Sequence, residues 1–91
     1  MSESPGFSCS LVSPLTHVRF ENVTVLVVQA TTGELGILAG HAPTVASLKG
    51  ESTVRATMTD SVRSFRIGAS SFLKFGNGEA VILTSEFGEQ V

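Results

Sequence analysis

The sequence predicts an all-β protein, an antiparallel β-sandwich or barrel with almost no helix. Apolar residues alternate with polar ones along several short segments, which is the pattern of strands with one buried face. Turn-forming residues separate these segments at close spacing. No window places apolar residues at helical spacing, and the abundant Gly, Ser, Thr and Val residues are weak helix formers. These patterns favour an antiparallel sandwich or barrel over a parallel α/β sheet.

The first strand is expected over residues 7–11, where apolar residues alternate with Ser8 and Ser10. This alternation predicts a half-buried strand. Pro14 ends it, and a short strand over residues 18–20 follows. Residues 23–28 are apolar on both faces and β-branched, so we expect a separate, more fully covered central strand there.

The middle of the chain is expected to alternate between loops and short strands. Residues 31–36 contain glycines three positions apart, which suits a tight loop, and a short strand is expected over residues 37–38. A second loop over residues 40–43 leads into a strand over residues 45–48.

The second half of the chain predicts two hairpins. Asp60-Ser61 is the expected turn of the first, and residues 76–79 form the turn of the second, because Asn and Gly accept left-handed geometry. About nine strands result, in one domain over residues 1–91 without repeats or linkers. The strands flanking the two turns are expected over residues 53–59, 62–67, 72–75 and 80–84.

The charge composition limits the partners that this chain is expected to bind. The net charge is −2 and the six basic residues are scattered, so we expect no nucleic-acid partner. Only 15% of residues are charged, against roughly 25% in ordinary soluble proteins. Either partners cover part of the surface, or Ser and Thr take the place of charged residues on the outside of a small sandwich.

The sequence also predicts where the protein is found. The longest apolar run covers residues 25–28, which is too short to cross a bilayer, and the start lacks the pattern of a signal peptide. A single cysteine, Cys9, fits a reducing compartment. We therefore expect a cytoplasmic protein.

No pattern of residues predicts an enzyme, a metal site or a cofactor. His17, His41 and Cys9 lack the spacing of zinc ligands. Gly33, Gly36 and Gly40 are followed by no Gly-Lys-Ser/Thr ending, so they predict turns and no phosphate loop.

A serine hydrolase is a rival hypothesis. Ser70 or Ser71, His41 and Asp60 supply the residue types of a catalytic triad, but a chain with so many serines offers such a trio by chance. By spacing alone His41 is a structural loop residue, and Glu34 is an exposed, solvated charge.

Residues 33–43, Gly-Glu-Leu-Gly-Ile-Leu-Ala-Gly-His-Ala-Pro, resemble the epsilon-subunit signature of bacterial and chloroplast F-type ATP synthases. That signature is usually written G-E-L-G-I-x-P-G-H-A-P, and Ala39 stands where it has its first proline. The resemblance continues through residues 72–75 and 81–86 and covers nearly the whole chain. The mitochondrial counterpart fits less well, because it carries a transit peptide that this start lacks.

The resemblance implies a ten-stranded antiparallel β-sandwich of two roughly five-stranded sheets at the foot of the central stalk, between the gamma subunit and the c ring. Such a subunit is a non-catalytic part of the rotor, and it couples proton-driven rotation to ATP synthesis. It is peripheral to the cytoplasmic face of the bacterial cell membrane and meets the membrane only through the complex. The alternative is a free-standing β-sandwich that binds another protein through the same loops.

Particular residues take roles by the same resemblance. Most family members continue into an inhibitory helical hairpin, so a chain ending at Val91 is expected to lack that arm and to bind no nucleotide. The expected contacts with the c ring are Glu34, Leu35 and His41, and the expected structural loop residues are Gly33, Gly36, Gly40 and Pro43.

Overall fold

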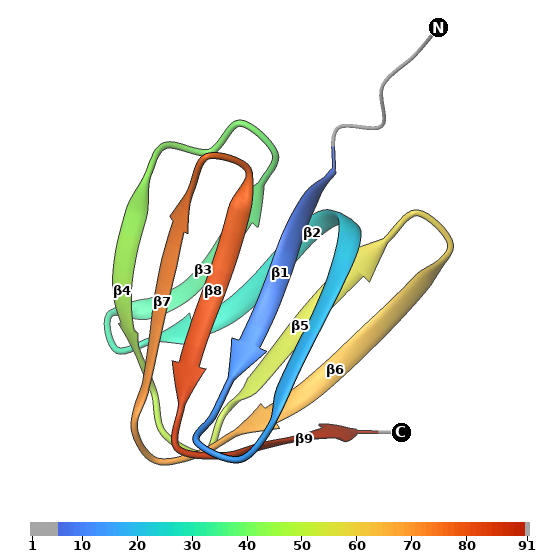
Figure 1. Cartoon of the computed structure of the whole chain (residues 1–91). Helices are drawn as coiled ribbons and strands as arrows, with labels where there is room; N and C mark the ends of the chain where they lie inside the picture. Colours follow the sequence, from blue (N-terminus) through green and yellow to red (C-terminus); the bar gives the residue numbers. More distant parts are fainter. Residues whose placement is uncertain (1–5, 91) are drawn as a thin grey trace, which may run out of the picture.

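A computed structural model describes residues 6–90 of the chain, which fold into nine strands and, within that range, no helix (Figure 1). The prediction of an all-β sandwich is confirmed. Its limits of 1–91 stay a prediction, because residues 1–5 and 91 lie outside the described part. The strands are β1 Phe7–Val12, β2 His17–Ala30, β3 Gly33–Leu38, β4 Thr44–Leu48, β5 Thr53–Met58, β6 Ser61–Ile67, β7 Ser71–Gly76, β8 Glu79–Thr84 and β9 Phe87–Gln90.

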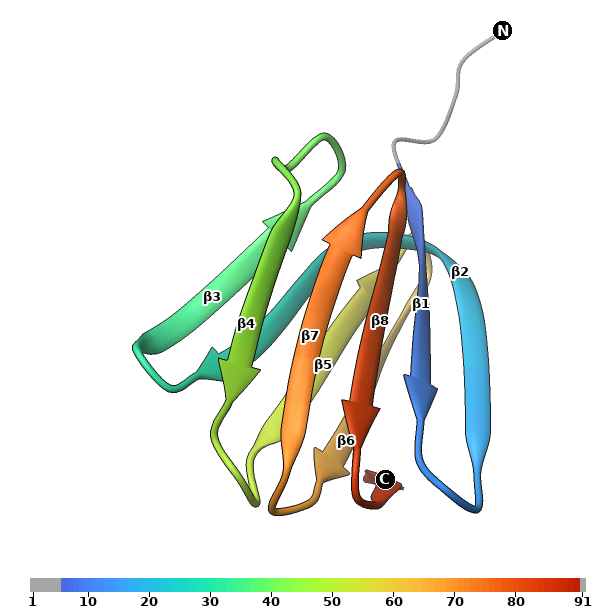
Figure 2. The same cartoon turned by 60° about the vertical axis from the view of Figure 1, so that its left-hand side comes forward.

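The long strand β2 belongs to both layers of the sandwich. Its first half pairs with β1, and its second half pairs with β3 and β5. The first sheet therefore has the order β4-β7-β8-β1-β2, and the second has the order β3-β2-β5-β6-β9. Figure 2 shows β2 passing from one layer to the other. Each layer has five strands when β2 is counted in both.

Asn22 marks the point where β2 bends. Its φ is 63°, in the left-handed region that Asn tolerates better than most residues. The pairing register also shifts here, between Val23 and Val25 against β5 and between Phe7 and Cys9 against β1. A bulge of this kind increases the local bend and twist. The prediction of two separate strands, over residues 18–20 and 23–28, is wrong. The backbone bends at Asn22, but its hydrogen bonding to the neighbouring strands continues on both sides of the bend.

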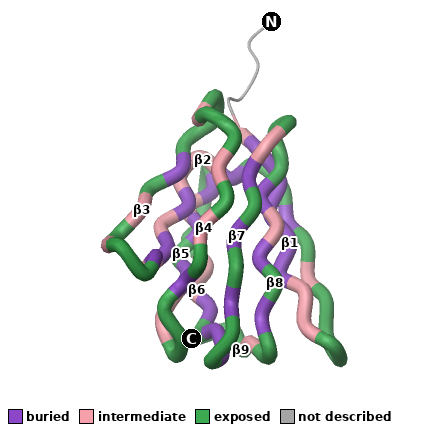
Figure 3. The backbone as a smooth tube through the Cα atoms, turned by 90° about the vertical axis from the view of Figure 1, so that its left-hand side faces the viewer, coloured by how far each residue is buried: buried purple, intermediate pink, exposed green. Residues whose placement is uncertain are grey.

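Alternating side chains from both sheets fill one core between the layers. Figure 3 shows buried and exposed positions alternating along β7. On β5 the side chains that face the core are Val54, Ala56 and Met58. The largest fully buried side chains are Phe65, Leu11, Leu26, Ile37, Ile67, Leu73 and Ile82.

The prediction of a half-buried first strand is wrong, because both faces of β1 are covered. Ser8 and Ser10 are only 9% and 5% exposed. β1 lies between β2 and β8 and runs parallel to β8, the exception in an otherwise antiparallel pairing pattern among residues 6–90. Ser10 is flanked by Arg19 on β2 and Val81 on β8, whose longer side chains shelter the small serine.

Two predicted turns differ from the structure. Residues 33–36 lie in β3, which pairs with β2 as far as Ala30 and Gly33, so the turn consists of Thr31 and Thr32. The first predicted hairpin turn is displaced by one residue, because Met58 pairs with Ser61 and leaves Thr59 and Asp60 in the turn. The second is confirmed: its central residues, Asn77 and Gly78, have φ values of 53° and 74°.

The last strand, β9, was not predicted, since Phe87–Gln90 contains a single large apolar residue. It pairs with β6 and is held there by Arg63. The Nε and Nη2 atoms of Arg63 donate to the two carboxylate oxygens of Glu89 at 2.9 and 2.7 Å. The same guanidinium lies 5.0 Å from the ring centroid of Phe20 and 5.2 Å from that of Phe65. The edge strand is thus fixed by charge and by an aromatic surface.

The backbone of Asn22 predicts a specific order of stabilities. Asn22→Ala should lower the free energy of unfolding by about 1 kcal/mol, because a Cβ without a polar group disfavours left-handed geometry. Asn22→Gly should leave it nearly unchanged. Urea unfolding measures both variants, with Glu21→Ala as a neighbouring exposed control. Equal losses of unfolding free energy in the Ala and Gly variants would contradict this explanation of the bend in β2.

The Arg63–Glu89 pair predicts a pH dependence. Hydrogen bonds and charge from Arg63 hold the pKa of Glu89 below its ordinary value of 4.5. The pair therefore stabilises the fold above that value, and its contribution is lost as the pH falls through the lowered pKa. Glu89→Gln should be less stable than the unaltered protein at pH 7, and the difference between the two should shrink as the pH falls below 4.5 in urea titrations. Glu86→Gln serves as the exposed control, and a constant difference at all pH values would refute the prediction.

Candidate interaction surfaces

Glu34 lies on β3, an edge strand of the second sheet, and its side chain is exposed on the outer face. It sits opposite Gln29 of β2, whose amide Nε2 donates to Glu34 Oε1 at 3.4 Å. The next residue, Leu35, points the other way, because neighbouring strand residues alternate in direction. Leu35 packs against the core opposite the buried Val28. Glu34 and Leu35, two of the three predicted contact residues, are therefore adjacent in the chain and lie on opposite faces.

His41 lies in the turn between β3 and β4 and is held by local contacts. Its backbone N–H donates to the Leu38 carbonyl at 3.0 Å. The ring Nδ1 is 2.8 Å from the Ala42 carbonyl, which can only accept, so Nδ1 carries the proton. The ring also stands edge-on to Phe75, with centroids 6.1 Å apart. These contacts support the structural role predicted from spacing.

The four predicted loop residues divide into two groups. Gly40, with φ of 85°, and Pro43 lie in the connection between β3 and β4. Gly33 and Gly36 lie within β3, where Gly33 begins the strand with φ of 138° and Gly36 pairs with Val27. A side chain added at Gly36 would meet nothing within 4 Å, so packing does not require glycine there.

The proposed triad is not assembled. His41 lies near Phe75, at the end of β7, whereas Ser71 is at its beginning. Those ends are roughly 13 Å apart at the usual rise per strand residue. The Ser71 hydroxyl instead lies 3.0 Å from the Gly68 carbonyl and 2.8 Å from Thr84 Oγ1. Asp60 belongs to the β5–β6 turn.

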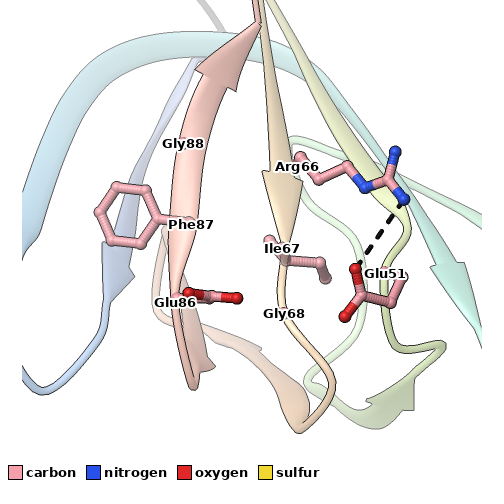
Figure 4. A pocket seen from close by; sticks show the side chains of 7 residues that line it. All are labelled: Glu51, Arg66, Ile67, Gly68, Glu86, Phe87 and Gly88. Atoms are coloured by element: carbon pink, nitrogen blue, oxygen red, sulfur yellow. Dashed lines mark ion pairs between the residues drawn. The ribbon is translucent and has the colours of Figure 1, made fainter.

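A shallow groove of about 310 Å³ lies beside β9 (Figure 4). Its charged side chains include Arg66, which is paired with Glu51 at 3.8 Å, and Glu86. No nucleophile with an adjacent base lines it. Within residues 6–90 no three His, Cys, Asp or Glu side chains are grouped as metal ligands, and no helix is long and apolar enough to cross a membrane.

An exposed, mainly apolar surface lies on the outer face of the first sheet over β4, β7 and β8, with Lys74 between Val45 and Val81. We call its four apolar residues, Val45 of β4, Phe72 of β7, and Val81 and Leu83 of β8, the apolar strip. Phe72 pairs directly with Leu83, and both are 52% exposed, while Val45 is 77% exposed. The strip lines a depression of about 400 Å³. Contiguous apolar surface of this kind marks a protein contact. This surface could have been found from the sequence, because Phe72 and Leu83 occupy positions of their strands that alternate with the buried ones.

The sandwich and its apolar strip are typical of a module that docks onto other proteins. The family defined as the beta-sandwich domain of the ATP synthase delta/epsilon chain matches residues 6–90, and the chain belongs to this family. The predicted resemblance is thereby confirmed.

Known relatives and structures agree with this assignment. The ATP synthase epsilon chain of Dichelobacter nodosus is 32% identical over 83 residues, which cover 91% of this chain and 57% of that one. The epsilon chain of Rhizobium meliloti (strain 1021) is 45% identical over 49 residues, covering 54% of this chain and 35% of that one. The chain thus spans little more than half of these relatives at most.

Two solved structures share the fold. A chain of the Euglena gracilis mitochondrial ATP synthase, solved as OSCP/F1/c-ring, superposes with a TM-score of 0.78 at 21% identity, covering 89% of this chain and 51% of that one. A chain of the Tetrahymena thermophila mitochondrial ATP synthase central stalk and c ring gives 0.74 at 11% identity, covering 89% and 64%. At these identities the likeness concerns the fold.

The burial of Cys9 predicts an unreactive thiol. Burial raises its pKa to about 12, so almost no thiolate is present at pH 8. A thiol-specific chromogenic disulfide should modify Cys9 only as fast as the protein unfolds. Ser61→Cys, an exposed hairpin position, should react within seconds on the same protein. Rapid reaction of Cys9 in the folded protein would contradict the packing of β1.

Proposed function

We propose that the chain is a non-catalytic central-stalk subunit of an F-type ATP synthase rotor, linking the gamma subunit to the c ring. The observation that carries the proposal is the family match over the entire described sandwich. The two structural neighbours support it, because both are chains of ATP synthase assemblies that include a c ring. In this role the subunit is peripheral to the cytoplasmic face of the bacterial membrane and couples proton-driven rotation to ATP synthesis.

The sandwich suits a mechanical role of this kind. Because β2 is shared by both sheets, the two layers cannot slide independently without breaking its ladders. The body is therefore stiff, and its two outer faces keep a fixed relation. The apolar strip lies on the first sheet and Glu34 lies on the second, so two partners can be contacted at once. We assign the strip to gamma and Glu34 to the c ring.

The apolar strip supplies the binding energy in this assignment. Complete burial of a large apolar side chain stabilises an interface by about 1.5–3 kcal/mol. Phe72 and Leu83, both half exposed, form a cross-strand pair that a partner can cover without any rearrangement of the core. The low charged content of the chain, 15%, agrees with a surface that is partly covered.

The double substitution Phe72→Ser with Leu83→Ser tests the assignment. It should weaken binding of the purified chain to the cognate gamma subunit by at least about tenfold, which is the loss of about 1.4 kcal/mol. Titration calorimetry measures the affinity, and urea unfolding verifies the fold. Val62→Ser is the matched control, since Val62 is 58% exposed on β6 and outside the strip.

The outcomes separate the alternatives. Gamma binding that is equally strong in the strip variant and the unaltered protein would overturn the assignment of the strip. Absence of any gamma binding by the unaltered protein would instead favour the free-standing protein-binding module.

A further inference from the structure

The strand β3 is an edge strand with one open side. Among residues 6–90 it pairs with β2 and with no other strand, and Figure 2 shows it at the left margin of the molecule. Its register against β2 runs without a shift from the pair of Ala30 and Gly33 to the pair of Val25 and Leu38. A regular edge strand offers a row of unpaired backbone groups to another chain.

The other edges of the sandwich are protected in ways that β3 is not. Natural edge strands are often short, charged or covered. Backbone hydrogen bonds tie the end of β4 to β2. The strand β9 has four residues against the six of β3, and the edge formed by the first half of β2 carries Arg19 and Glu21. The one charged residue of β3 is Glu34, and the strand contains no proline or lysine.

The turn between β2 and β3 determines which backbone groups of β3 are free. The pair that flanks this two-residue turn, Ala30 and Gly33, exchanges both of its hydrogen bonds. Bonded and non-bonded pairs alternate along an antiparallel ladder, so every second residue of β3 from Gly33 onward bonds to β2. The residues between them, Glu34, Gly36 and Leu38, therefore turn their N–H and C=O groups to the open side.

The β3 strand of a second copy matches this row of groups. In an antiparallel pair centred on Gly36, the two Gly36 residues face each other and each Glu34 faces Leu38 of the other copy. These positions all present open-side groups, so about six backbone hydrogen bonds can form. The Leu38 carbonyl already accepts the His41 N–H at 3.0 Å, but a carbonyl has a second lone pair. A pair centred on Glu34 would instead oppose two carboxylates.

The side chains of β3 also fit a pair centred on Gly36. Gly36 has no side chain to separate the two backbones at the axis. On the outer face, Leu38 is 55% exposed and would lie beside the aliphatic part of Glu34 of the second copy. On the inner face, Leu35 is partly buried against the core and would face Ile37 of the second copy. Apolar contacts of this kind stabilise paired strands.

We propose that two copies of this chain form a symmetric dimer in which their β3 strands pair antiparallel about Gly36. The second sheets of the two copies then form one continuous sheet. This self-association goes beyond the rotor function and does not depend on it. The dimer places a second copy against the strand that carries Glu34, so dimerisation and any other contact made by this edge compete.

Charge substitutions at Leu38 test both the dimer and its register. Leu38→Lys should tighten the dimer about fivefold, because two pairs of opposite charge form with Glu34 across the axis. Leu38→Glu should weaken it by about the same factor, because it opposes two carboxylates twice. Sedimentation velocity from about 1 µM to about 1 mM protein measures the dimer affinity. The matched controls are Val62→Lys and Val62→Glu, at an exposed position of β6, and neither should change the affinity.

A second variant removes the central hydrogen bonds. Gly36→Pro deletes an N–H that faces the open side, a position where an edge strand tolerates proline. It should weaken the dimer by at least about tenfold, the loss of two hydrogen bonds, while urea unfolding verifies the fold. The double substitution Phe72→Ser with Leu83→Ser should leave the dimer unchanged, because the apolar strip lies on the other sheet.

The outcomes decide the proposal without reference to gamma binding. A chain that stays monomeric over the whole concentration range would overturn it. Equal dimer affinities of the two Leu38 variants, or an unchanged affinity in a folded Gly36→Pro variant, would also overturn it. A dimer that disappears only in the Phe72 and Leu83 double variant would place the contact on the apolar strip and refute pairing through β3.

Discussion

The continuity of β2 through both sheets is the constraint on which the rest of the structure depends. A single strand can serve two layers only if its backbone turns sharply without losing its ladder, and the left-handed Asn22 provides that turn. The inward side chains of its two halves then meet those of both sheets in one core. The same continuity fixes the orientation of the two outer faces.

The outer faces of the two sheets differ in chemistry, and this difference supports the proposal that each face meets a different partner. The first sheet exposes Val45, Phe72 and Leu83 close together, whereas the second exposes the carboxylate of Glu34 and the guanidinium of Arg55 on either side of Val27. Apolar burial supplies affinity, and separated charges supply orientation. A rigid body with one surface of each kind suits a link between two parts of a rotor.

Much of the fold could be predicted from alternation alone, because strand period is a local property. The inner faces of β5 and β6 and the Asn77-Gly78 turn follow from it. The predicted loop over residues 31–36 was wrong because glycines suggest turns, whereas Gly33 and Gly36 extend an exposed edge strand. The parallel position of β1, the apolar strip and the placement of Glu34 and Arg55 on one outer face depend on cross-strand register, which no local pattern contains.

The most direct test of the central claim is a cryo-EM structure of the cognate ATP synthase isolated with this chain. The sandwich should lie at the foot of the central stalk, with β4, β7 and β8 against gamma and the outer face of β3 and β5 toward the c ring. A complex that lacks the chain, or one that leaves both of these faces in solvent, would contradict the account.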